Sequence, residues 1–225
     1  MSDEKKSREE IKEKVGVALD CLGKICTAAS GISPIFGIAG CLLQLASASL
    51  KGEELDDIKT GFRKAEDGLQ GISEGIADMM LQIKEDKALK RFNEIEFRIK
   101  NQFRAYVEAV ECEQERKSIK IDDFLTQYTM NGSHKHICAL YDSVMGNRKL
   151  FSEPILKVYM DVYRGNKNDM KKLCDHLKYL FAIGIITYME YVYIVSDGDP
   201  GPEEEWKSKS KDVWDKMDAV LKQCK

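Results

Sequence analysis

The feature that most restricts the fold of this chain is an apolar seam that runs from residue 53 to residue 84. Apolar side chains recur in this stretch at alternating spacings of three and four residues, which places them on one face of an α-helix. Side chains spaced in this way interlock with those of a second long helix, within the same chain or on a partner. The 55–83 seam is therefore a candidate interaction surface, and its members are Leu55, Ile58, Phe62, Leu69, Ile72, Ile76, Met79 and Ile83.

The remaining sequence is helical in its periodicity as well, and no stretch alternates apolar and polar residues for long. A second long helix is predicted over 88–115, antiparallel to the first. Shorter helices are predicted over 7–29, 35–50, 122–130, 133–145 and 152–163, and a largely apolar helix over 168–195. We expect an all-α fold, a single bundle of about seven or eight helices around a central apolar helix.

Turn and capping residues set the expected boundaries. Asn131-Gly132 is suited to the left-handed conformation that closes a helix, and Asn168 is the expected N-cap of the apolar helix. Residues 197–202 form an acidic turn rich in proline and glycine, which is the one clear linker. We therefore divide the chain into a helical bundle at 1–196, this turn, and a C-terminal amphipathic helix at 203–225 that packs back on the bundle.

Composition argues against a nucleic-acid partner and for a cytoplasmic protein. The formal net charge is −3, and basic residues are scattered among acidic ones, whereas a nucleic-acid-binding protein shows a basic excess or stripe. The first residues, MSDEKKSREE, are highly charged and are not followed by the apolar segment of a signal peptide. The seven cysteines are an odd, widely spaced set, which is typical of reduced thiols inside the cell.

No pattern in the sequence predicts catalysis or a cofactor. A Gly-rich phosphate loop, a G-x-S-x-G turn and an H-E-x-x-H zinc motif are all missing from the sequence. His134 and Cys138 are spaced to share one helix face, but His136 points away from both, and a structural zinc needs four ligands. Cys174 and His176 are a second, weaker pair. We predict no enzyme activity, no catalytic, cofactor-binding or metal-binding residues, and no cofactor.

Two apolar segments raise the question of a membrane. Residues 25–50 carry no charged side chain, and residues 179–195 carry only Glu190. Burial within a bundle is the preferred explanation. The alternative, a helix that is buried in solution and moves into lipid on contact, predicts the same apolarity. The candidate membrane-active residues are Ile35, Phe36, Leu42, Phe181, Ile185 and Ile186.

Several short strings resemble the rapunzel family in order and spacing over nearly the whole chain. They are ISPIFGI at 32–38, YDSVMG at 141–146, FSEPILKVY at 151–159, LFAIGI at 180–185 and the charged, Trp-containing tail that ends at 223–225. Glu190 departs from the small apolar residue expected at its position.

The resemblance implies a vertebrate group, centred on fish and associated with fin and skeletal growth. It also implies likeness to cephalotoxin-type proteins and, more distantly, to the helical N-terminal domain of δ-endotoxins, where helices surround a central apolar helix. The family pattern contains no catalytic residues to carry over.

Three functions follow as hypotheses. The first is a non-enzymatic bundle that binds an unknown protein partner in growth and development. The second is a conditionally membrane-active, pore-former-like bundle, which would associate peripherally with membranes. The third is a small-ligand carrier with a cavity near Phe181 and Tyr188. The sequence leaves the oligomeric state open.

Overall fold

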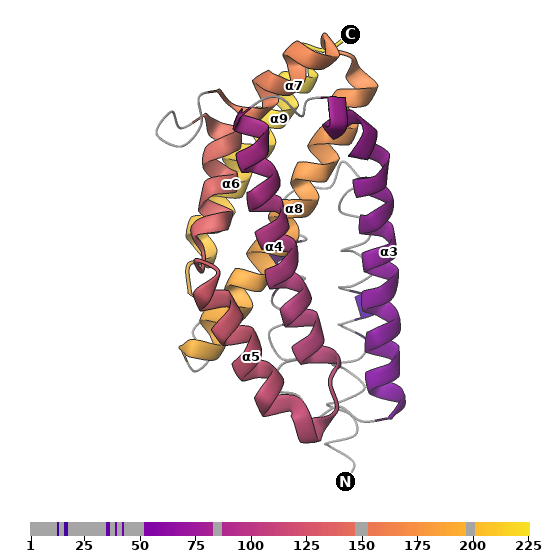
Figure 1. Ribbon diagram of the computed structural model, residues 1–225, viewed down its shortest axis with the longest axis vertical. Helices are drawn as coiled ribbons and strands as arrows, with labels where there is room; N and C mark the ends of the chain where they lie inside the picture. The colour runs from indigo at the N-terminus through magenta and orange to yellow at the C-terminus, as the bar shows by residue number, and fades with distance from the viewer. Residues whose placement is uncertain are drawn as a thin grey trace.

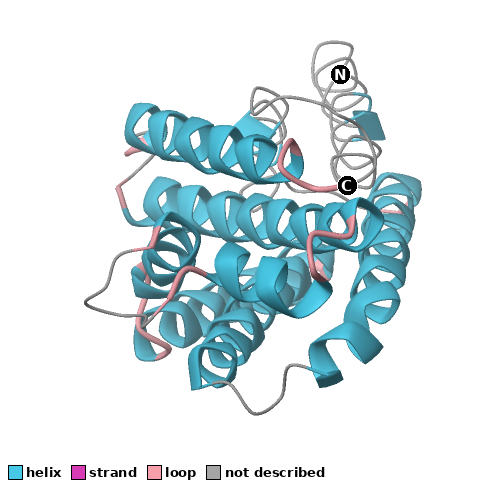
Figure 2. Cartoon of the chain, turned by 90° about the horizontal axis from the view of Figure 1, so that it is seen from above, coloured by secondary structure: helices cyan, strands magenta, loops and turns pink. Residues whose placement is uncertain are grey.

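The computed structural model describes residues 52–82, 87–146, 153–196 and 201–225, together with single positions before residue 43. The expected helices at 7–29 and 35–50 therefore fall largely outside the described part, although Ile35, Phe36, Ala39 and Leu42 are helical. The described residues form helices and turns with no strand, which confirms the all-α bundle. Figures 1 and 2 show these helices gathered into one bundle.

The two predicted long helices are α3 (Glu53–Gln82) and α4 (Lys87–Glu111), which run in opposite directions in Figure 1. A short 3-10 turn, η1 (Gln114–Arg116), follows α4. The remaining helices are α5 (Lys117–Met130), α6 (Lys135–Met145), α7 (Ile155–Tyr163), α8 (Lys167–Val195) and α9 (Glu203–Leu221).

Two boundaries differ from those expected. Helix α5 begins at Lys117 rather than Asp122, and the buried Lys117 side chain donates from Nζ to the carbonyl of Val110, 2.9 Å away. The N-cap of α8 is Asn166 rather than Asn168, because the Asn166 side chain accepts hydrogen bonds from the backbone N–H groups of residues 168 and 169. The expected left-handed turn after α5 is confirmed at Gly132, with φ of 91°.

Helix α8 lies at the centre of the bundle, as expected for the most apolar helix. It packs against α3, α4, α6, α7 and α9, and nearly every residue from Leu177 to Glu190 is buried. Each surrounding helix supplies an apolar stripe. Removing these stripes from water is the main source of stability for such a bundle.

Helix α9 packs on α6 and α8 through one face. Trp206, Val213, Trp214 and Met217 lie on this face and are buried, while the opposite face carries charged residues. The division of the chain at 197–202 stays a prediction, since residues 197–200 are outside the described part.

Gly184 lies where α8 crosses α6 and α4, and an added side chain there would crowd the end of the Ile137 side chain. A Cβ atom built there would lie 2.7 Å from Cδ1 of Ile137 and 3.5 Å from Cγ2 of Ile99. Gly184→Ala should therefore lower the free energy of unfolding by about 1–2 kcal/mol, since crowding outweighs the gain of about 1 kcal/mol in helix propensity. Urea unfolding measures this difference.

Two controls locate the cause of this loss. Ile137→Val removes the crowding methyl group, so Gly184→Ala should be nearly neutral in that background. Gly75→Ala, on the exposed face of α3 with no atom within 4 Å of the new Cβ, should be neutral or stabilising. If Gly184→Ala lowered the free energy of unfolding by the same amount in the parent and in the Ile137→Val background, the crowding explanation would be wrong.

Candidate functional site

The described part of the 55–83 seam faces the interior of the bundle. Its buried members are Leu55, Ile58, Phe62 and Ile76. The side chains of its other members lie outside the described part, namely those of Leu69, Ile72, Met79 and Ile83. The four buried side chains pack within the chain itself and are therefore not available to a partner.

The candidate membrane-active residues are also placed in the core. All six are at most 6% exposed, and they are Ile35, Phe36, Leu42, Phe181, Ile185 and Ile186. Helix α8 is long and apolar enough to span a membrane by length and composition, and 67% of its most apolar window is buried inside the protein. The core helix of a water-soluble protein meets the same criterion. This finding therefore does not distinguish a core helix from one that moves into a membrane.

Aromatic rings occupy the region suggested for a small-ligand cavity. Phe181 meets Trp214 edge-on, with ring centroids 6.2 Å apart. Tyr188 stacks on His134 at 5.5 Å and meets Trp206 edge-on at 6.1 Å. Since both tryptophans belong to α9, the C-terminal helix fills this side of the bundle.

A polar cluster ties α8 to α4 at the edge of the core. His176 on α8 is 1% exposed, and its Nε2 lies 3.2 Å from Oε2 of Glu96, whose Oε1 lies 2.6 Å from Nζ of Lys100. Burial raises the pKa of Glu96, but the hydrogen bonds and charges of His176 and Lys100 outweigh burial and hold that pKa at about 2. The ionised carboxylate therefore stabilises the fold above pH 4.5, and this contribution is lost as the pH falls towards 2.

Glu190, near the C-terminal end of α8, is in the opposite situation. Its side chain is 1% exposed, and neither carboxylate oxygen has a hydrogen-bond partner among the described residues. Lys117 is the neighbouring cation, but its Nζ already donates to the Val110 carbonyl. Burial raises the pKa of Glu190 to about 8, and the charge of Lys117 offsets only part of that rise. The carboxyl group is therefore mostly protonated at neutral pH.

Sequence reasoning missed the burial of His176 and did not foresee the state of Glu190. Both residues continue the apolar stripe of α8 at spacings of three and four, together with Leu173, Leu180 and Ile183. A polar residue in register with a core stripe is the sequence signal that identifies such buried groups.

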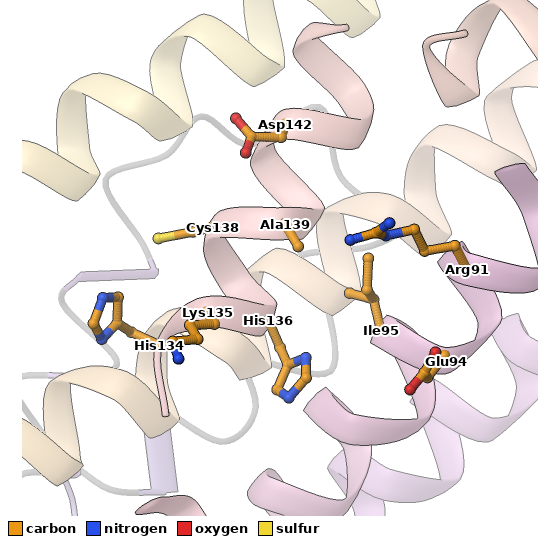
Figure 3. A pocket seen from close by; sticks show the side chains of 9 residues that line it. All are labelled: Arg91, Glu94, Ile95, His134, Lys135, His136, Cys138, Ala139 and Asp142. Carbon is orange, nitrogen blue, oxygen red and sulfur yellow. The ribbon is translucent and has the colours of Figure 1, made fainter. Parts of the chain in front are cut away.

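An open groove between α4 and α6 is the main candidate for binding a partner. It has a volume of about 520 Å³. Helix α4 lines one wall, and the start of α6 lines the other. Its lining residues are Arg91, Glu94, Ile95, His134, Lys135, His136, Cys138, Ala139 and Asp142 (Figure 3). The groove combines an apolar base with charged groups of both signs, which suits a polar protein surface better than a single small ion.

The side chains around this groove do not form a metal site. In Figure 3, Cys138 and His134 point to one side of α6, whereas the His136 side chain projects in a different direction. His136 Nε2 is hydrogen-bonded to the carbonyl of Asn131. Within the ranges that the structure describes, no three His, Cys, Asp or Glu side chains are grouped so that they could hold a metal ion.

Comparisons with known proteins agree with the helical architecture. Residues 50–225 match the family described as the cephalotoxin-like middle helical domain. The chain is 36% identical to protein rapunzel of Danio rerio over 217 residues, which cover 96% of each chain. No solved structure matches, so likeness to the δ-endotoxin N-terminal domain stays a prediction.

Glu190→Gln tests the buried acid, because the amide is isosteric with the protonated carboxyl group. An acid whose pKa rises from 4.5 to about 8 on folding destabilises the native state increasingly between those pH values. The variant should therefore equal the parent in stability near pH 4 and exceed it by roughly 3 kcal/mol at pH 7. Urea unfolding across pH 4 to 8 measures the difference.

The matched control is Glu113→Gln at an exposed position, which should change stability by less than about 0.5 kcal/mol at every pH. Parallel pH profiles for the parent and Glu190→Gln would show that the Glu190 carboxyl group is solvated and titrates normally.

Proposed function

This chain belongs to the rapunzel-type family of cephalotoxin-like helical proteins, and from this premise we propose that it acts without catalysis, by binding a protein partner in growth and development. Family membership supports the developmental setting, since the resemblance associates these proteins with fin and skeletal growth. The observation that carries the binding proposal is the open α4–α6 groove, none of whose lining residues belongs to the 55–83 seam.

The surface charges support a protein partner rather than a nucleic acid. Many exposed lysines are paired with an acid one helical turn away, including Lys157 with Glu153 at 2.6 Å and Lys171 with Asp175 at 2.8 Å. Such pairing leaves little positive potential to attract phosphates. The thiols of Cys112, Cys138, Cys174 and Cys224 are free, in keeping with a cytoplasmic location.

Groove variants test the binding proposal. Glu94→Lys reverses a charge at an exposed position of the α4–α6 groove, and Ala139→Arg fills the groove from α6. Quantitative proximity labelling in cells measures which proteins the parent chain captures. Either variant should recover these proteins at least ten-fold less than the parent does. The loss is expected because the groove would no longer match its partner in charge or shape.

Asp67→Lys provides the matched charge reversal, on the exposed face of α3 and away from this groove. It should leave capture unchanged. Thermal unfolding should show that all three variants are folded. Equal capture by the groove variants and the parent would refute this site for partner binding.

The alternative is a conditionally membrane-active bundle, and a specific observation favours it. Helix α8 is long and apolar enough to span a membrane, and burial keeps the one carboxyl group between Tyr179 and Val195 mostly protonated at neutral pH. Placing a protonated carboxyl group in lipid costs far less free energy than placing a carboxylate there. Release of α8 from the bundle would then be the main barrier to insertion.

Flotation with anionic and neutral liposomes, together with dye release, tests this alternative across pH 5 to 7.5. If the alternative holds, flotation and leakage should occur at pH 7, and Gly184→Ala, which loosens the packing of α8, should increase both. Protein that stays at the bottom with intact vesicles at every pH would contradict it and leave the protein-binding function.

A further inference from the structure

A second groove lies between α3 and α4, on a different side of α4 from the α4–α6 groove. Both helices pack more extensively on α8 than on each other. The resulting α3–α4 groove has a volume of about 560 Å³, within the range of small-molecule sites. Its lining residues are Gln70, Ser73, Glu74, Lys100, Phe103, Arg104 and Tyr179.

The floor of the α3–α4 groove is aromatic. Phe103 from α4 and Tyr179 from α8 are 4% and 6% exposed, so each ring presents only a small face to the groove. Both rings are fixed by the core behind them, which gives the floor a defined shape. A flat, apolar group placed on this floor would gain burial without requiring the helices to move.

One wall of the groove is held in place by Lys100. Its Nζ lies 2.6 Å from Oε1 of Glu96, donates to Oγ of Ser73 at 3.0 Å, and sits 5.9 Å from the centroid of the Tyr179 ring. Lys100 therefore links α3, α4 and α8. Because its ammonium group is already paired with the Glu96 carboxylate, Lys100 mainly holds the wall of the groove in place.

Arg104, one turn further along α4, has no acidic partner among the described residues. Glu108, its natural partner at the i+4 position, is engaged by Lys120 at 3.1 Å. The one acid that lines the groove, Glu74, accepts a hydrogen bond from Gln70 at 2.8 Å. An exposed guanidinium group therefore lines the groove beside the aromatic floor, and guanidinium groups bind carboxylates and phosphates through two N–H groups.

We propose that the α3–α4 groove binds a small organic anion with a flat or chain-like apolar body. The apolar body lies on Phe103 and Tyr179, and the anionic group pairs with Arg104. This role is independent of the proposed partner-binding function, because the two grooves have no lining residue in common.

Fluorescence titration with 1-anilinonaphthalene-8-sulfonate, which combines a sulfonate with aromatic rings, tests the proposal on the full chain. We expect saturable binding at one site. Arg104→Glu should weaken it at least ten-fold, because a repulsive carboxylate replaces the cation. Lys90→Glu, an exposed charge reversal on the same helix outside the groove, should bind the dye as tightly as the parent does.

Competition separates the role of charge from simple hydrophobic adsorption. Decanoate should displace the dye from the parent at least ten-fold more effectively than decanol, and this preference should disappear in Arg104→Glu. Circular dichroism and thermal unfolding should be the same for all three proteins, since loosely folded chains also bind this dye. Unsaturable dye binding, equal affinity of Arg104→Glu and the parent, or equal displacement by decanol would each overturn the proposal.

Discussion

The burial of helix α8 on nearly all sides is the constraint on which the rest of the structure depends. The segment of α8 from Leu177 to Glu190 is apolar on nearly every face and has to be enclosed, and α3, α4, α6, α7 and α9 each supply an apolar stripe to enclose the helix. The crossing at Gly184 brings α8 close to α4 and α6, so a single hydrogen atom in place of a side chain sets the spacing of three helices. The amphipathic character of the other helices follows from the need to cover this one.

Enclosing α8 also places two of its polar side chains, His176 and Glu190, in opposite surroundings. His176 meets Glu96, and together with Lys100 this contact keeps a partly buried carboxylate charged at the edge of the core. Glu190 meets no hydrogen-bond partner among the described residues, and burial therefore keeps it mostly protonated at neutral pH. The same helix thus contains one polar group that helps fix its packing on α4 and another that weakens the fold as the pH rises.

The surfaces left for function are the places where helices diverge around α8. The α4–α6 groove offers charges of both signs, as a protein interface does, while the α3–α4 groove offers an aromatic floor and a guanidinium group with no acidic partner in the described ranges. The apolar faces that dominate the sequence are enclosed in the core wherever the structure describes them. Binding by this family member is therefore expected to depend on the grooves between helices rather than on the strongest hydrophobic signal.

The sequence by itself determined the all-α class, the two long helices, the central position of 168–195 and the family, because helical periodicity and short apolar strings are local properties. It could not decide whether the 55–83 seam met a partner or the chain's own core, since both produce the same spacing of Leu55, Ile58 and Phe62. Only the tertiary structure placed Glu96 beside His176, turned Lys117 inward and set Arg104 at the edge of a groove. Those outcomes depend on contacts between residues far apart in the chain, and the free energy of a charge or an apolar face is set by what surrounds it after folding.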